Sequence, residues 1–358
     1  MRSLVQAAIA ILVVCALLFF AAHQLESRGS AGSQDTITVF NWGEYIDPDL
    51  IDQFTEETGI KVIYETFDSN EAMKTKIEQG GSAYDVAVPS EYMVEMMIED
   101  ELLLPIDHSK LPNLKNIDPY FLDLAFDPGN QYSIPYFWGT VGIVFNPTLV
   151  EDHLTFTTWE DLWDPSLQDK VFLVDGAREV MGMGLNSLGE SLNSKDEALL
   201  QQATEKLISL SPNIKAIIGD EITPLMINNE ATVALTWSGQ AADMMWENED
   251  LDFAVPEEGS NLWFDNFVIP KTAGNVDGAH AFINFMLDAE NSAQNNDYVG
   301  YSTPNLAAMA LMDPEVIEDE RFYPSEELRD KLEVYENLGL EWLGKYNEYF
   351  LEFKMSLQ

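Results

Sequence analysis

"ITVFNWGEYIDPDLIDQF", residues 37–54, is the stretch that decides the fold, because it joins an apolar strand directly to a helix. Its first residues are mostly β-forming, which is typical of a buried strand. Asp47 and Pro48 are residue types that begin helices, and Gly59 is a type that ends them. Between the two elements, "NWGEY" (41–45) brings aromatic and acidic side chains to the end of the strand.

The same order of elements continues after this stretch. Residues 61–67 predict a second strand, 69–79 a helix that ends at a glycine pair, and 85–89 a short buried strand. A further helix is expected from Ser90 onward. Strands that alternate with helices are typical of a parallel sheet with helices on both faces, so the sequence predicts an α/β fold.

Two long β-type segments distinguish the rest of the chain. Residues 133–147 exceed the length of a usual strand and are bounded by prolines, and 264–271 form a second such segment. We interpret both as crossings between two lobes. Around them the sequence predicts helices at 158–162, 178–188, 196–210, 277–287 and across most of 325–354, and strands at 171–174, 231–236 and 252–255. Two lobes joined in this way favour a ligand cleft that closes by hinge rotation.

The chain has 358 residues, which exceeds the usual size of a single core. We expect a front segment at 1–35, a first lobe from 36–142 plus 266–322, and a second lobe from 143–265 plus 323–358.

The front of the chain predicts attachment to a membrane. Residues 4–22 are apolar and uncharged, and Arg2 favours a cytoplasmic N-terminus. The remainder is therefore expected on the extracytoplasmic face of the cell membrane, tethered through 26–34 or released after signal cleavage. Cys15 is the only cysteine and lies in the apolar run, so disulfides and thiolate chemistry are excluded from the exported part.

The composition is strongly acidic, with 62 Asp and Glu against 18 Lys and Arg and a formal net charge of −44. Such a field repels nucleic acid and attracts cations. Adaptation to salty or alkaline surroundings explains most of this excess. The four histidines lack metal-like spacing, and no phosphate loop or nucleophile motif occurs. We therefore expect neither an enzyme nor a cofactor, although an acid pair such as Asp175 with Glu179 keeps a glycan hydrolase open.

Aromatic and acidic residues recur where strands are expected to end. They are Trp42, Glu44, Tyr45, Ser90, Glu91, Tyr92, Asp175, Glu179, Trp237, Trp263, Asp265 and Tyr301. Singly, such residues are more often core side chains or helix caps. Together they match the needs of an ammonium ligand, because each aromatic face stabilises a cation by roughly 0.5–2 kcal/mol. Carboxylates pair with the charge and accept its N–H bonds.

Several segments in order resemble one known family. "VFNWGEYIDPDLIDQFTEETGIKVIYETFDSNEAM", "YDVAVPSEYMV", "SIPYFWGTVGIVFN", "WEDLWDP", "DGAREV" and "GYSTPNLAA" are similar to segments of the spermidine/putrescine-binding proteins of polyamine ABC importers. The resemblance covers the chain from about residue 36 to its end. It implies a two-lobed periplasmic-binding-protein fold that captures spermidine or putrescine. It also implies, as partner, a membrane permease driven by a cytoplasmic ATPase, and we expect a monomer.

The resemblance also implies roles for individual residues. Trp42, Glu44 and Tyr45 would form one wall of the site, and Ser90 and Tyr92 would contact one amine end and the methylene chain of the ligand. Glu179 would accept a hydrogen bond from an amino group, and Asp265 would pair with a buried amine. The rings of Trp237 and Trp263 would stack on the ligand, Tyr301 would add an aromatic contact, and Glu336 would supply a polar contact from the C-terminal tail.

This sequence departs from the family pattern at two places. Gly43 stands where the relative has a hydroxyl residue, and Asp175-Gly176 stands where it has two acids, of which the missing one is a ligand contact. We expect Asp175 or Glu336 to supply the missing partner, which leaves putrescine and spermidine both open. Two rival ligands or activities also remain: another cation, such as a quaternary amine or metal ion, and the hydrolysis of surface glycans.

Overall fold

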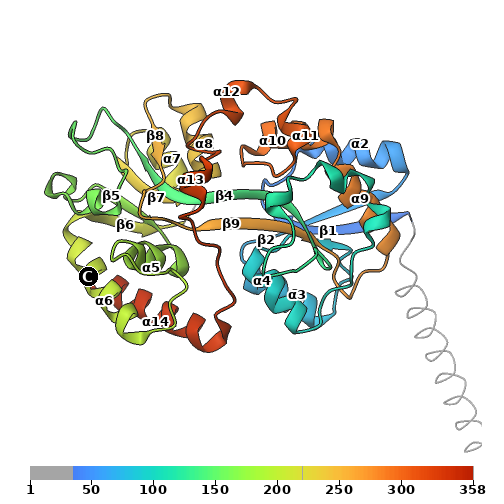
Figure 1. Ribbon diagram of the computed structural model, residues 1–358, viewed down its shortest axis with the longest axis horizontal. Helices are drawn as coiled ribbons and strands as arrows, with labels where there is room; N and C mark the ends of the chain where they lie inside the picture. Colours follow the sequence, from blue (N-terminus) through green and yellow to red (C-terminus); the bar gives the residue numbers. More distant parts are fainter. Residues whose placement is uncertain (1–34, 220, 358) are drawn as a thin grey trace, which may run out of the picture.

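The computed structural model describes residues 35–219 and 221–357, which form two α/β lobes side by side. Figure 1 shows one lobe around β1 (Thr36–Trp42) and the other around β5 (Val171–Val174), with two long strands running between them. The two-lobed α/β fold predicted from the sequence is therefore confirmed.

The first lobe contains the parallel sheet that the sequence predicts. β1 lies between β2 (Lys61–Phe67) and β3 (Val86–Ala87) and is parallel to both. The helices that follow these strands are α2 (Pro48–Thr58), α3 (Asn70–Gln79) and α4 (Glu91–Glu99). Ile37, Val39 and Phe40 of β1 are fully buried, as a strand covered on both faces requires.

Local chemistry sets the limits of α2. The side chain of Asp47 accepts a hydrogen bond from the Asp49 N–H and so satisfies one of the free donors of the first turn. Gly59 ends the helix with a φ of 73°, and its N–H donates to the Thr55 carbonyl. A left-handed backbone of this kind favours glycine.

Two antiparallel strands join the lobes. β4 (Ser133–Phe145) pairs with β9 (Leu262–Val268) along its first half, from Ser133 opposite Val268 to Thr140 opposite Leu262. Beyond that point β4 pairs with strands of the second lobe instead. Both crossings predicted from the sequence are thus present, and β4 belongs to the hydrogen-bonded sheets of both lobes (Figure 1).

The second lobe continues the same sheet. Its strands are β5, β6 (Ile214–Ile218), β7 (Val233–Trp237) and β8 (Asp252–Ala254), and its helices are α5 (Ala177–Asn186), α6 (Glu197–Leu210), α7 (Ile222–Ile227) and α8 (Ser238–Glu247). The strand order is β2-β1-β3-β9-β4-β7-β5-β6, and β8 pairs with β4 outside this path. The sequence prediction located β5, β7 and β8 but missed β6, α7 and α8. The helix predicted at 158–162 is present as a 3₁₀-helix at Trp159–Trp163.

Most of residues 325–354 are helical, as predicted. The helices of the C-terminal region are α9 (Val276–Met286), α10 (Ala289–Val299), α11 (Leu306–Met309), α12 (Pro314–Ile317), α13 (Glu326–Arg329) and α14 (Gly339–Ser356). Residues 330–338 are the non-helical part of this stretch. The backbone of Glu333 instead pairs with the start of β9, donating to Ser260 and accepting from Leu262. These intersegment bonds replace the bonds of a helix.

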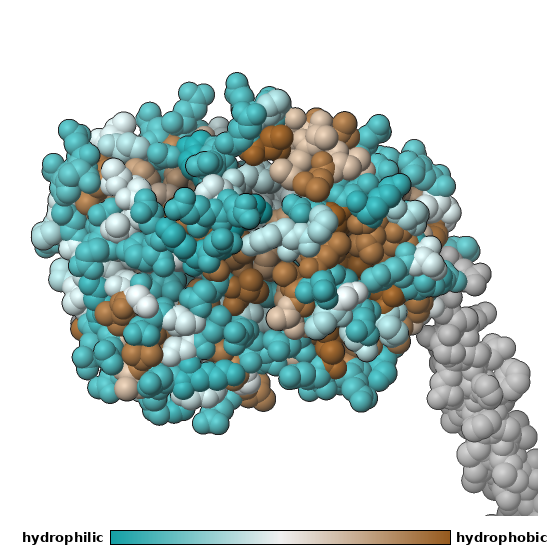
Figure 2. All heavy atoms as spheres, in the orientation of Figure 1, coloured by the Kyte–Doolittle hydropathy of each residue, from teal (hydrophilic) through white to brown (hydrophobic). Residues whose placement is uncertain are grey.

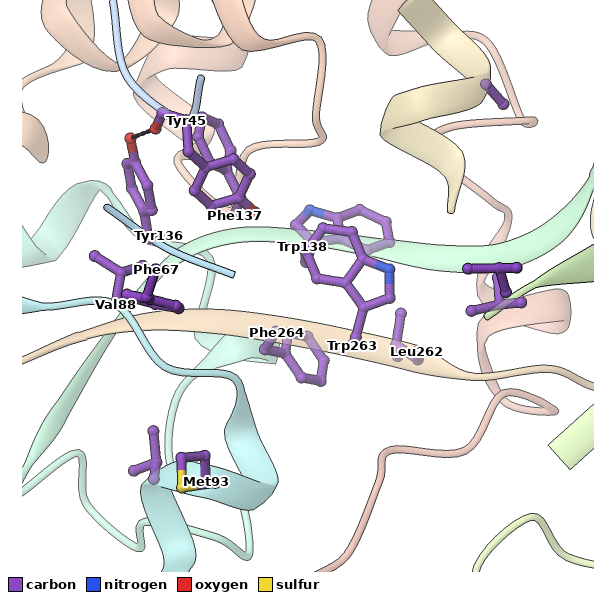
Figure 3. Close-up of a cluster of buried hydrophobic side chains, with 14 of the residues drawn as sticks. Tyr45, Phe67, Val88, Met93, Tyr136, Phe137, Trp138, Leu262, Trp263 and Phe264 are labelled. Atoms are coloured by element: carbon purple, nitrogen blue, oxygen red, sulfur yellow. Dashed lines mark hydrogen bonds between the residues drawn. The ribbon is translucent and has the colours of Figure 1, made fainter. Parts of the chain in front are cut away.

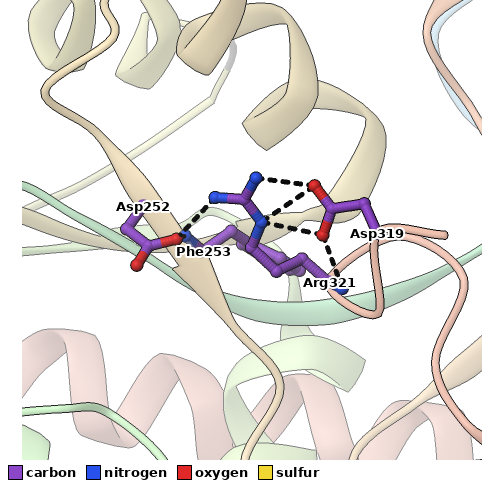
Figure 4. Close-up of polar contacts among 4 residues, drawn as sticks. All are labelled: Asp252, Phe253, Asp319 and Arg321. Carbon is purple, nitrogen blue, oxygen red and sulfur yellow. Dashed lines mark hydrogen bonds and ion pairs between the residues drawn. The ribbon is translucent and has the colours of Figure 1, made fainter. Parts of the chain in front are cut away.

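An arginine fixes the chain before α13 against the second lobe. The Arg321 guanidinium forms ion pairs with Asp252 on β8 at 2.8 Å and with Asp319 at 2.6 Å (Figure 4). The ring of Phe322 stacks on that of Phe253, with centroids 5.9 Å apart. Residue 322, our predicted end of lobe 1, therefore already contacts β8. The lobe boundaries stay predictions.

The surface is mainly polar. Figure 2 shows hydrophilic residues over much of the visible face, with hydrophobic residues gathered near the middle and over the lobe that contains β1. Among residues 35–219 and 221–357, no helix combines the length and the apolar character needed to cross a membrane. The predicted membrane segment at 4–22 lies outside the described residues.

Candidate functional site

The centre of the candidate site is the carboxylate of Asp265, which lies on β9 and is 6% exposed. The Ser90 hydroxyl donates to its Oδ1 at 2.7 Å, and the Tyr45 hydroxyl donates to its Oδ2 at 2.7 Å. Three segments that are far apart in the sequence thus meet on one acidic group. We call Tyr45, Ser90, Trp263, Asp265 and Tyr301 the Asp265 cluster.

The fold positions Ser90 for this contact. Ser90 is the N-cap of α4, but its side chain makes no capping bond to the helix and so can reach Asp265. The two residues are also joined by an isolated backbone bridge. The Asn70 amide, at the start of α3, donates to the Ser90 hydroxyl and to the Tyr92 hydroxyl, each at 3.1 Å. α3 and α4 therefore hold the serine and Tyr92 together.

Burial controls the charge of Asp265. It raises the pKa of this carboxyl to about 6, against an ordinary value of 3.8, while the bonds from Ser90 and Tyr45 lower it. Asp265 is therefore mostly ionised at neutral pH. The two hydroxyls stabilise this negative charge without neutralising it, and within the described part of the chain no Lys or Arg forms an ion pair with it.

Aromatic rings surround the carboxylate. The ring of Tyr301 lies 5.3 Å from that of Tyr45 and 5.3 Å from that of Trp263, both edge to face. Figure 3 shows Tyr45, Phe137 and Trp263 gathered along the crossing strands β4 and β9. The buried indole Nε1 of Trp263 has no hydrogen-bond partner among the described residues. A buried anion among aromatic faces suits a cation with apolar parts.

Two glycines let these rings approach the backbone. A Cβ at Gly139 on β4 would overlap the indole of Trp263, and a Cβ at Gly239 in α8 would overlap the ring of Tyr301. Tyr301 thereby packs directly on the first turn of a helix of the second lobe.

Two further acidic residues, Glu71 and Glu179, lie near Tyr92. The Tyr92 hydroxyl donates to Glu71 Oε1 at 3.3 Å. Burial raises the pKa of Tyr92, and the negative charges of Glu71 and of Glu179 in α5 raise it further. Tyr92 of the first lobe therefore lies within electrostatic reach of Glu179 of the second lobe. Burial also raises the pKa of Glu179, while neighbouring Arg178 lowers it. Glu179 lines a small cavity together with Tyr335.

Three predicted residues stand at strand ends beside the cluster. Trp42 ends β1; its indole N–H donates to the Val88 carbonyl at 2.9 Å and its ring packs on Phe67. Glu44 is exposed and has a φ of 53°. Trp237 ends β7 immediately before α8 and is partly buried.

Two other predicted residues have different neighbours. The carboxylate of Asp175 pairs with the Lys354 ammonium of α14 at 2.7 Å. Glu336 is exposed, and its backbone, rather than its carboxylate, bonds to Arg178 and Asn193. Neither acid is joined to Asp265 in this arrangement, so their roles as ligand contacts stay predictions.

The structure adds residues to which sequence reasoning assigned no role. Asn70 and Glu71 follow β2, and Tyr335 lies in the non-helical part of 325–354. A signal for the first two was present, because they too stand just after a strand. Glu91 was noted at a strand end, but the family resemblance gave it no function.

Comparison with known proteins agrees with this architecture. The family model for bacterial extracellular solute-binding proteins matches residues 49–324. The spermidine/putrescine-binding periplasmic protein of Salmonella typhimurium is 39% identical over 329 residues, which cover 92% of this chain and 94% of that protein.

Solved structures extend the comparison. A Listeria monocytogenes structure, assigned to a spermidine/putrescine ABC transporter, has 60% sequence identity and a TM-score of 0.84, covering 90% of this chain and 99% of that one. PotD from Streptococcus pneumoniae, a spermidine/putrescine ABC transporter substrate-binding protein solved in complex with calcium and HEPES, has 56% identity and a TM-score of 0.84, covering 90% of this chain and all of that one. Because these matches extend through both lobes, the chain belongs to the family of bacterial extracellular solute-binding proteins.

Proposed function

We propose that this protein is an extracytoplasmic receptor that binds a linear polyamine, spermidine or putrescine, between its two lobes. The observation that carries the proposal is the ionised, buried carboxylate of Asp265, whose bonds within residues 35–219 and 221–357 come from two neutral hydroxyls and which aromatic rings surround. A buried charge without a counter-charge is costly, and a bound ammonium group would supply the missing partner.

The two acidic groups suit a ligand with separated charges. One ammonium would lie against Asp265, and a second would lie near Glu179 and Tyr92, with the methylene chain between the rings of Trp263 and Tyr301. Trp42, Glu44, Trp237, Asp175 and Glu336 complete the proposed contacts. Closure of the lobes would exclude water and strengthen each contact, although removing water from the amines offsets much of the gain.

The wider role follows from the relatives. The names of the Listeria monocytogenes and Streptococcus pneumoniae structures refer to spermidine/putrescine ABC transporters, and the Salmonella typhimurium relative is named as a spermidine/putrescine-binding periplasmic protein. We infer that this chain delivers its ligand to permease subunits driven by a cytoplasmic ATPase, acts as a monomer without catalysis, and is attached to the membrane through its front segment. Lobes at 36–142 plus 266–322 and at 143–265 plus 323–358 would move against each other.

A ligand panel tests the proposal. Thermal unfolding of the purified full chain is expected to shift upward with putrescine or spermidine, because a ligand that binds the folded state stabilises it. Choline and divalent metal ions are the comparison ligands, and Asp265→Asn is the variant expected to lose the shift. A shift with choline or metal alone would favour the rival cations. Sugar release from surface glycans would favour the hydrolase.

A further inference from the structure

Glu91 is a fully buried acid beside the Asp265 cluster. It occupies the first turn of α4, directly after Ser90, and is 0% exposed. Its Oε2 accepts the Phe264 N–H at 2.8 Å, which is the backbone position immediately before Asp265. Its Oε1 is buried and has no hydrogen-bond partner in the described part of the chain. A buried polar atom in this state requires an explanation.

A purely structural role does not explain the carboxyl group. The Phe264 N–H needs one acceptor, and one carbonyl oxygen satisfies it. The second oxygen adds no bond to the described protein groups, and burying an unbonded polar atom costs free energy. This arrangement of Glu91 therefore fits a carboxyl group whose second oxygen or negative charge is used when ligand is bound.

The charged and titratable groups around Glu91 come from four elements. Asp265 on β9 has a negative charge that opposes ionisation of Glu91, and Arg178 on α5 has a positive charge that favours it. Tyr335 from the tail and Tyr92 from its own helix also lie within its electrostatic reach. Glu179 of α5 acts on the same two tyrosines. Burial dominates and raises the pKa of Glu91 to about 8.

We propose that Glu91 is a positioning residue of the amine site that loses a proton when an ammonium group binds beside Asp265. The proposal rests on the function proposed above. In the ligand-free protein Glu91 stays neutral, so Asp265 has no second negative charge beside it. The arriving positive charge favours the ionised form of Glu91. The carboxyl O–H bond then breaks, its proton passes to water or buffer, and the electron pair stays on the carboxylate.

This role predicts coupling between binding and proton release. Near pH 7.5 Asp265 is already mostly ionised, whereas Glu91 is still mostly protonated. Binding is expected to release about 0.8 proton per ligand if Glu91 ionises fully in the complex. Affinity would rise with pH between about 6.5 and 8, by up to about tenfold per pH unit.

Calorimetry of the full chain with putrescine tests this coupling. Titrations at pH 7.5 in two buffers with different ionisation enthalpies give the number of protons released. Glu91→Gln keeps an acceptor for the Phe264 N–H but cannot ionise. The variant is therefore expected to release fewer protons per ligand than wild type, and the difference is the proton release due to Glu91. The difference between the two proteins cancels any protons exchanged by the ligand. Glu99→Gln, an exposed change on the same helix, is the matched control and should release as many protons as wild type.

The outcomes separate the two proposals. If wild type does not bind any polyamine, the proposed function fails. If wild type binds but releases no proton between pH 6.5 and 7.5, or if Glu91→Gln releases as many protons as wild type, the role of Glu91 is overturned. If Glu91→Gln does not fold, the pH dependence of the wild-type release decides the question: release that persists at pH 7.5 is expected from Glu91, whereas release confined to pH values near 6 comes from Asp265 and overturns the role of Glu91. The role of Glu91 is supported if wild type and Glu99→Gln release equal numbers of protons on binding and Glu91→Gln releases fewer.

Discussion

At the scale of single residues, Asp265 is stabilised as an anion only in part. Two hydroxyls donate to it, yet burial still raises its pKa to about 6. Binding-site residues often trade stability for function in this way. The same carboxylate should therefore weaken the ligand-free fold and strengthen the complex.

The first prediction concerns affinity. Asp265→Asn keeps the shape of the side chain, and the Ser90 and Tyr45 hydroxyls can still bond to the amide. Loss of the charge is expected to weaken polyamine binding by about 2–5 kcal/mol, because a buried ligand charge loses its partner. Isothermal titration measures the change, and Asp277→Asn, on the surface beside Lys110, is the control. Equal affinity in wild type and Asp265→Asn would contradict the role of Asp265.

The second prediction concerns stability without ligand. Because the folded-state pKa of Asp265 is raised, the folded state binds more protons than the unfolded state between about pH 4 and 6, and stability falls as the pH rises through that window. Asp265→Asn removes this loss. At pH 7 the variant should unfold with a free energy higher by about 3 kcal/mol, and near pH 3.5 the difference should vanish. Urea unfolding at both pH values measures it. A variant less stable than wild type at pH 7 would oppose this account.

The limits of sequence reasoning are visible at this scale. Tyr45, Ser90, Trp263, Asp265 and Tyr301 were all selected at strand ends or through the family resemblance, and the structure brings them together. Asp175 and Glu336 were selected for the same reasons but have other neighbours. The partner of an exposed carboxylate depends on a distant lysine such as Lys354, and no local pattern encodes such a contact.

At the scale of elements, helix α8 can approach the Tyr301 ring closely because Gly239 has no side chain there. Gly239→Ala would place a methyl group against the Tyr301 ring and displace it from Trp263 and Tyr45. We expect a loss of affinity of about 0.5–2 kcal/mol, the contribution of one aromatic face to a bound cation. Titration calorimetry measures it.

A second glycine provides the control for this change. Gly344 lies on the exposed side of α14, and a Cβ there would meet no atom within 4 Å. Gly344→Ala should leave affinity unchanged and stabilise the helix by up to about 1 kcal/mol. If Gly239→Ala bound polyamine as tightly as Gly344→Ala, Tyr301 would have no part in binding.

Element prediction succeeded where the pattern was local. β1 to β3 with their helices, and both crossings, were recognised from alternating apolar runs, caps and prolines. β6 was missed because its residues are only partly buried at the edge of the sheet, so its pattern is weak. The sequence predicted that 325–354 is mostly helical but did not locate its non-helical part. The backbone of residues 330–338 bonds to the start of β9 and to α4, and helix-forming residues do not reveal such long-range pairing.

At the scale of the whole molecule, the paired strands β4 and β9 run between the lobes. Residues 330–338 add contacts to the first lobe, since the Asn337 N–H donates to Glu95 and its side-chain amide donates to Glu99, both on α4. The closure proposed above would bend β4 and β9 together and shift these Asn337 contacts.

Net charge gives a prediction at the same scale. A formal charge of −44 should speed the approach of a polycation, and dissolved salt should screen this attraction. The association rate constant for spermidine is expected to fall several-fold as salt is raised from about 0.02 M to about 0.3 M, where the Debye length is only several ångströms. Stopped-flow tryptophan fluorescence measures this rate. A rate independent of salt would mean that the acidic surface serves solubility alone.

The most direct test of the central claim is a crystal structure of this protein with spermidine. The account predicts one ammonium nitrogen within hydrogen-bonding distance of Asp265, a second near Glu179, and the methylene chain between the rings of Trp263 and Tyr301. Spermidine bound elsewhere, or bound between the lobes without contact to Asp265, would contradict it.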